Sequence, residues 1–280
     1  MEVSTFELLV KRIAPKMALP PAAQPVARRI VQGYFLTLSN LETIDLRYRL
    51  EFRISLPDNP AQADAVTRIL EGNTFLIFDI AGSNNTLSLT RVGTTGRYIS
   101  QEFVIPAQKT ASIELLPDVV RFASQDDPAL EIRGFVSLFL PRIFTGTTLP
   151  ERFIGRPQSP RPVKVLLNAE IRGTFLPNDF PANPASADFD HINYSLALAS
   201  GKALNEIESE PPRILVPGSS VGLELTAGAV RMSSASDSAA TDLGAMIAGL
   251  MVSSNGNGGN LESLNRSLAE LDLPVTMRGM

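Results

Sequence analysis

The sequence contains no cysteine, no tryptophan and a single histidine, His191. Without cysteine the chain has no disulfide bonds, thiolate metal sites or cysteine nucleophiles. One histidine is too few for the multi-histidine sites of most zinc hydrolases. Aromatic residues make up only 6% of the chain. This scarcity disfavours the stacking platforms on which sugars and single-stranded bases bind.

The chain also lacks an excess of either charge. Its formal net charge is -4 at pH 7, and acidic and basic residues are interspersed. No basic stripe is available to follow a phosphate backbone, so we expect no nucleic-acid partner. The hydrophobic fraction of 44% and the charged fraction of 19% are typical of a chain that folds around a core.

Long apolar runs are absent as well. The longest, residues 243–252, has about half the length that a bilayer span requires. The first 24 residues carry an acidic residue at position 2 and basic residues after a short apolar run, which is not the pattern of a secretory signal. We therefore expect a cytoplasmic protein without a transmembrane segment.

The first residues show a helical pattern. Residues 4–7 fit a capping box, and apolar residues recur at helical spacing from Phe6 to Ile13. Pro15 ends this pattern, and a segment rich in proline and alanine follows. A helix this short is not stable alone. We expect it to dock on the body of the protein, on a second copy or on a membrane surface.

From residue 33 onward the apolar pattern repeats every two residues. Residues 44–56 form the clearest predicted strand, with one apolar and one charged face. Residues 33–41 closely precede it, which predicts a hairpin. Further strands are predicted at 74–81, 86–92, 97–105, 110–116, 119–124, 130–140, 163–176, 188–199 and 221–226. Strands in series without long helices between them favour a mainly β fold, an antiparallel β-sandwich of the jelly-roll or Ig-like type.

The last part of the chain returns to helical spacing. Apolar residues in 236–252 and 261–271 each follow it, and a segment rich in glycine and asparagine joins the two. This pattern predicts a C-terminal helical hairpin. We divide the chain into an N-terminal helix and tether (1–25), a β-sandwich body (26–232) and the hairpin (233–280). The body is either one domain or two β subdomains that meet near 142–162.

Alternation along the strands predicts both a core and a local repeat. The predicted core residues are Leu46, Tyr48, Leu50, Phe52, Ile54, Phe75, Ile77, Ile132, Val136 and Leu138. The sequence Glu-Ile-Arg-Gly occurs twice, at 131–134 and at 170–173. We expect each copy to place an exposed Glu/Arg pair before a glycine that allows a bulge or a close backbone approach.

Two motifs resemble functional sites but lack the required context. Asp188, Asp190 and His191 could bind a divalent metal, but alternation on a strand directs the imidazole away from the carboxylates. Ser220 lies in a G-x-S-x-G pattern, yet no histidine follows it and the next residues alternate like a strand. We therefore predict no catalytic, metal-binding or cofactor-binding residues and no cofactor.

Arginine greatly outnumbers lysine, with 20 arginines and five lysines. Arginine is enriched and lysine depleted in protein interfaces. Together with the two predicted helical ends, this bias favours a non-enzymatic structural or scaffold protein that forms homo-oligomers or binds an assembly partner. The rival hypothesis is a ligand- or carbohydrate-binding β-sandwich module, and an enzyme comes third.

Overall fold

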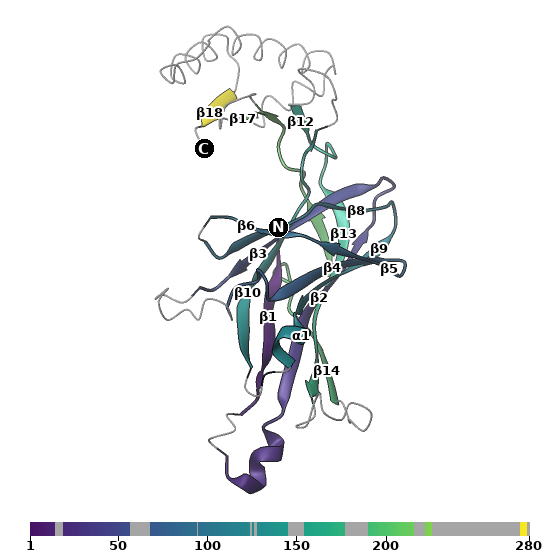
Figure 1. Ribbon diagram of the computed structural model, residues 1–280. Coiled ribbons are helices and arrows are strands. Elements are labelled where there is room, and N and C mark those ends of the chain that lie inside the picture. Colours follow the sequence, from purple (N-terminus) through teal and green to yellow (C-terminus); the bar gives the residue numbers. More distant parts are fainter. Residues whose placement is uncertain are drawn as a thin grey trace, which may run out of the picture. The chain divides into compact units, whose positions relative to one another are not determined.

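The computed structural model describes residues 1–14, 19–56, 68–93, 95–123, 125, 128–144, 154–176, 190–215, 222–225 and 275–278, and these residues are mainly β (Figure 1). They belong to two compact units. Unit 1 consists of Met1–Phe139 and Val163–Ile207, and unit 2 of Leu140–Pro162 and Glu208–Met280.

Unit 1 is built on one large antiparallel sheet that is nearly closed. Its strands are β1 (Glu2–Arg12), β2 (Arg29–Asn40), β3 (Leu46–Ile54), β4 (Thr74–Ile80), β5 (Ser83–Leu87), β6 (Leu89–Arg91), β7 (Arg97–Ser100), β8 (Phe103–Ile105), β9 (Thr110–Pro117), β10 (Ala129–Phe139), β13 (Val163–Leu176), β14 (Asp190–Ser195) and β15 (Leu204–Ile207). The strand order is β5-β4-β9-β2-β1-β10-β3-β7-β6. Strand β13 pairs with β2, β14 and β15, and β8 pairs with β3.

The sheet branches at β2. Strand β13 pairs with the whole length of one edge of β2. The other edge is shared, because β1 pairs with residues 29–32 and β9 with residues 34–39. The two halves of the sheet therefore diverge beyond Gly33 and enclose the core. Phe6 of β1 contacts Tyr34 of β2 and Phe52 of β3 there, at ring-centroid distances of 6.0 and 5.7 Å.

The predicted N-terminal helical arm is wrong, because residues 2–12 form strand β1, which pairs along β10. Leu8, Leu9 and Val10 are all buried, so both faces of β1 are covered. A strand buried on both faces shows no strict alternation, and its apolar residues can coincide with helical spacing. The predicted β-sandwich is likewise replaced by the single, nearly closed sheet.

Unit 2 contains a small antiparallel sheet with the order β11-β12-β16-β17-β18. Its strands are β11 (Ile143–Phe144), β12 (Ile154–Arg156), β16 (Arg213–Leu215), β17 (Gly222–Leu225) and β18 (Val275–Arg278). The helical hairpin predicted over 233–280 is not part of the described fold. Strand β18 is the portion of that range that the structure describes, and the two predicted helices lie outside the described residues.

Helices are few and short. The described part contains a 3-10 helix, η2 (Pro21–Val26), and one α-helix, α1 (Val119–Ala123). We expected a strand over 119–124, but Asp118 accepts a hydrogen bond from the Arg121 amide through its side chain and caps the helix instead. No helix among the described residues is long and apolar enough to cross a lipid bilayer.

The hairpin predicted between residues 33–41 and 44–56 is also wrong, because β2 and β3 do not pair. Asn40, which is fully buried, redirects the chain between them. Its side-chain amide donates hydrogen bonds to the carbonyl oxygens of Ile44, Ile105 and Pro106. Its side-chain oxygen accepts a hydrogen bond from the Glu42 amide. The side chain thus supplies contacts that a tight hairpin turn would otherwise provide.

The core agrees with the prediction except in β4. The buried residues that were predicted are Leu46, Tyr48, Leu50, Phe52, Ile54, Ile132, Val136 and Leu138. Phe75 is 48% exposed and Ile77 is partly exposed, whereas Leu76 and Phe78 are buried. Strand β4 has apolar residues at both parities, so alternation could not determine which face points inward.

Candidate functional site

A groove with a volume of about 490 Å³ opens on unit 1 beside β1, β10, β13 and β14. Its apolar lining includes Phe6, Phe135, Ile171 and Leu196. Its polar lining includes Glu7, Arg133 and Tyr194. Phe6 and Ile171 are buried, whereas Phe135 is 38% and Tyr194 45% exposed. The groove therefore has an apolar floor and two aromatic side chains that are accessible from solvent.

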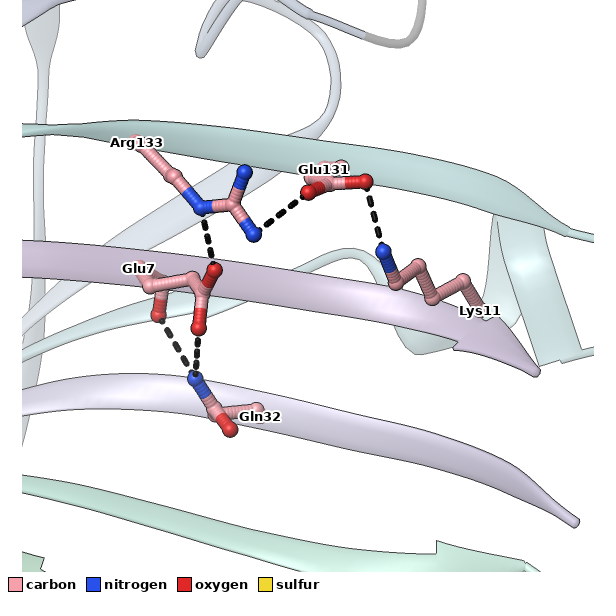
Figure 2. Close-up of polar contacts among 5 residues, drawn as sticks. All are labelled: Glu7, Lys11, Gln32, Glu131 and Arg133. Atoms are coloured by element: carbon pink, nitrogen blue, oxygen red, sulfur yellow. Dashed lines mark hydrogen bonds and ion pairs between the residues drawn. The ribbon is translucent and has the colours of Figure 1, made fainter. Parts of the chain in front are cut away.

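Figure 2 shows a chain of polar contacts that includes Glu7 and Arg133 of the groove lining. Lys11 donates to Glu131 at 2.7 Å, and Arg133 contacts Glu131 at 2.6 Å. The Nε of Arg133 donates to Oε1 of Glu7 at 2.5 Å, and Nε2 of Gln32 lies 3.3 Å from Oε2 of Glu7. Glu7 and Arg133 are direct cross-strand partners, so the β1/β10 register places the contacts on one face.

These contacts determine the charge states around the groove. The hydrogen bond from Lys11 lowers the pKa of Glu131, and the hydrogen bond to Glu7 raises the pKa of Arg133. Burial, followed by the charge of Glu7, raises the pKa of Tyr194. The charged forms of Glu131 and Arg133 are therefore favoured, and Tyr194 stays protonated near neutral pH.

Next to the groove, arginines stack on phenylalanines across β3 and β10. Arg53 lies over Phe135 and Arg49 over Phe139, with guanidinium carbons 5.9 and 5.2 Å from the ring centroids. Each arginine is the direct cross-strand partner of its phenylalanine. We call these four residues the arginine–phenylalanine ladder. Phe135 belongs to both the ladder and the groove lining, so the two form one continuous face.

A buried carboxylate, Glu51, positions one arginine of this ladder. Glu51 lies between Arg49 and Arg53 on β3, and its side chain is 1% exposed. It accepts hydrogen bonds from Nε of Arg53 at 2.8 Å and from Nη2 of Arg97 at 2.6 Å. Two charged donors compensate the desolvation of the carboxylate. The Arg53 side chain, 54% exposed, is thereby fixed beside Phe135.

The residues considered as a metal or catalytic site are not brought together. Asp190 forms an ion pair with Arg28, and His191 has the opposite parity on β14. Asp188 and Ser220 lie outside the described residues. Within the described ranges, no group of three or more histidine, aspartate or glutamate side chains is placed to hold a metal ion.

The repeated Glu-Ile-Arg-Gly sequence has the same local structure twice. Glu131 pairs with Arg133 at 2.6 Å, and Glu170 pairs with Arg172 at 2.9 Å. At the glycines that follow, Gly134 and Gly173, a Cβ atom would lie 2.0 Å from Arg53 O and 2.8 Å from Val31 O, respectively. The predicted close backbone approach is confirmed. One copy of the repeat supplies Arg133 and Gly134 to the groove lining, where no site was predicted.

Glu7, Gln32 and Tyr194 were not identified from the sequence. Glu7 and Arg133 are 126 positions apart, and only the pairing of β1 with β10 brings them together. No family model matches this chain, and neither a curated protein nor a solved structure matches it. The inference of function therefore rests on the geometry of the groove and the ladder.

Proposed function

We propose that the chain is a non-enzymatic structural protein that self-associates into a homo-oligomer, and that the groove and the ladder belong to its contact surface. One observation carries the proposal: arginines stacked on partly exposed aromatic rings form a continuous face next to an apolar groove. Arginine and aromatic residues are the types most enriched in protein interfaces. The cytoplasmic location expected from the sequence stays a prediction.

The charge on this face supports contact between identical copies. The network beside the groove contains two cations, Lys11 and Arg133, and two carboxylates, Glu7 and Glu131. A face whose charges are already paired does not repel a copy of itself. The same pairing leaves the arginine side chains ordered, which lowers the entropy cost of association.

Size-exclusion chromatography with light scattering tests the proposal on the full chain. We expect the wild type to have a mass above that of one chain at high micromolar concentration. Phe135→Asp should weaken association at least tenfold, because it places a charge at the junction of ladder and groove. Val104→Asp is the matched control, since Val104 is 42% exposed, lies on β8 and is not part of the groove lining.

The two variants separate the possible results. Equal masses for wild type and Phe135→Asp, with unchanged circular dichroism, would show that the groove face is not part of the interface. A wild type that stays monomeric at every concentration would reject self-association itself. Loss of association in Val104→Asp alone would place the interface on another part of the molecule.

The groove itself favours a second candidate function, binding of a small ligand. Its volume of about 490 Å³ lies within the usual range of small-molecule pockets, about 300–1,000 Å³. Arg133 and Tyr194 on the polar side would orient a ligand with hydrogen-bond acceptors. A thermal-shift screen with mono- and disaccharides tests this idea. Ligand binding in the groove predicts that some compound raises the Tm of the wild type but not that of Arg133→Gln.

A further inference from the structure

We infer that β14 pairs antiparallel with β14 of a second copy around a two-fold axis, so that two sheets join edge to edge. This inference rests on the proposed self-association and names its partner and register. Strand β14 borders the groove through Tyr194. Among the described strands β14 pairs with β13 alone, so no described strand pairs with its outer edge.

The six residues of β14 lack the sequence features that usually protect an exposed edge strand. They include no lysine, arginine or proline, and the register of β14 with β13 is continuous without a bulge. Its one acidic residue, Asp190, forms an ion pair with Arg28. By contrast, β15 on the same edge of β13 carries Glu206. Edges without charges, prolines or bulges are the ones that accept another strand.

Hydrogen-bond alternation shows which backbone groups of β14 point outward. The amide of Leu196, just after β14, donates to the carbonyl of Ala169 in β13. In an antiparallel ladder, every second residue directs both its N–H and its C=O to the same neighbour. Asp190, Ile192 and Tyr194 therefore bond to β13. The outward-facing residues are His191, Asn193 and Ser195.

This parity restricts the register of a two-fold pair. Two antiparallel edges exchange hydrogen bonds only between residues whose backbone groups both point outward. In the register centred on β14, Asn193 therefore lies opposite Asn193 of the second copy, and His191 lies opposite Ser195. The interface is isologous, because each contact occurs twice. It satisfies the outward N–H and C=O groups of all three residues.

The side chains match in the same register. On the face that carries Tyr194, Ile192 of one copy lies opposite Tyr194 of the other, a favourable pairing of a β-branched and an aromatic residue. On the opposite face, the two Asn193 amides meet and can exchange hydrogen bonds. No like charges lie opposite each other. Tyr194 is 45% exposed in the single chain, so this pairing would cover it.

Disulfide trapping tests the register directly, because the chain contains no cysteine of its own. Asn193→Cys should give a covalent dimer on mild oxidation. The Cα atoms of a hydrogen-bonded antiparallel pair are about 5.5 Å apart, which a disulfide can bridge. His191→Cys alone is the matched control, because its two copies would be four residues out of register, about 13 Å apart. Mixing His191→Cys with Ser195→Cys should restore the crosslink.

Light scattering of the wild type, measured in parallel, separates the two hypotheses. Crosslinking of Asn193→Cys at least tenfold faster than of His191→Cys supports the β14 pair. Equal or absent crosslinking of the two variants, together with an oligomeric mass of the wild type, would overturn the β14 pair and leave self-association standing. A monomeric wild type, together with no crosslinking of either variant, would reject both hypotheses.

Discussion

Arg97 donates a hydrogen bond of 2.6 Å from Nη2 to Oε2 of Glu51, whose side chain is 1% exposed. This contact ties β7 to β3 on the face that carries the arginine–phenylalanine ladder. A buried carboxylate is tolerated only when charged donors replace its hydration. The pair therefore links the stability of unit 1 to the arrangement of the proposed contact face.

The first prediction concerns acid sensitivity. Burial raises the pKa of Glu51, but the hydrogen bonds from Arg97 and Arg53 lower it more, so its net pKa falls below the ordinary value of 4.5. A lowered folded-state pKa contributes stability above the unfolded value, and this contribution is lost as the pH falls through the folded value. Glu51→Gln should lower the free energy of unfolding by about 2 kcal/mol at neutral pH and by less at about pH 3.

Urea denaturation at both pH values measures this difference. Glu131 and Glu170 also have lowered pKa values, so the variant should keep part of the acid sensitivity of the wild type. A variant whose stability falls as steeply with pH as that of the wild type would show that Glu51 is not held ionised in the folded protein.

The second prediction concerns the close approach at Gly134. A Cβ atom there would lie 2.0 Å from the carbonyl oxygen of Arg53, which is backbone and cannot move aside without disturbing β3. Gly134→Ala should therefore lower the free energy of unfolding by about 3 kcal/mol. Gly82→Ala is the comparison, because Gly82 has φ of +83° but open space around it, and should cost about 1 kcal/mol. Similar losses for both variants would mean that β10 and β3 are not this close.

The third prediction tests the corrected face of β4. Leu76 is 1% exposed, so Leu76→Ala should cost about 3 kcal/mol. Phe75 is 48% exposed, and Phe75→Ala should cost less than about 1 kcal/mol. Thermal or chemical denaturation of the two variants measures both values. The reverse order would support the inward face first predicted, which carries Phe75 and Ile77.

Strands with strict alternation could be predicted from the sequence, because one face of each is apolar and the other polar. Strand β13 (Val163–Leu176) has the predicted bounds, and β3 lies within its predicted range. Strand β1 could not be recognised, because both of its faces are covered by long-range neighbours. The pairing of β2 with β13 and β9 instead of β3 has no local signal either.

The candidate site was not predicted from the sequence. The Glu-Ile-Arg-Gly repeat indicated an exposed Glu131 and Arg133, whose ion pair is local, but nothing in it indicated a groove. Glu7, Gln32 and Tyr194 join them from three other strands. Each belongs to an unremarkable sequence context, and only the folded sheet brings them to one groove.

Hydrogen exchange at β14, followed by residue-resolved NMR from low to high micromolar concentration, tests the central claim most directly. The amides of Ile192 and Tyr194 bond to β13 and should be protected at every concentration. The amides of Asn193 and Ser195 point outward, so their protection should rise at least tenfold as copies associate. If these two amides exchange fast at every concentration, the β14 strands of two copies do not pair.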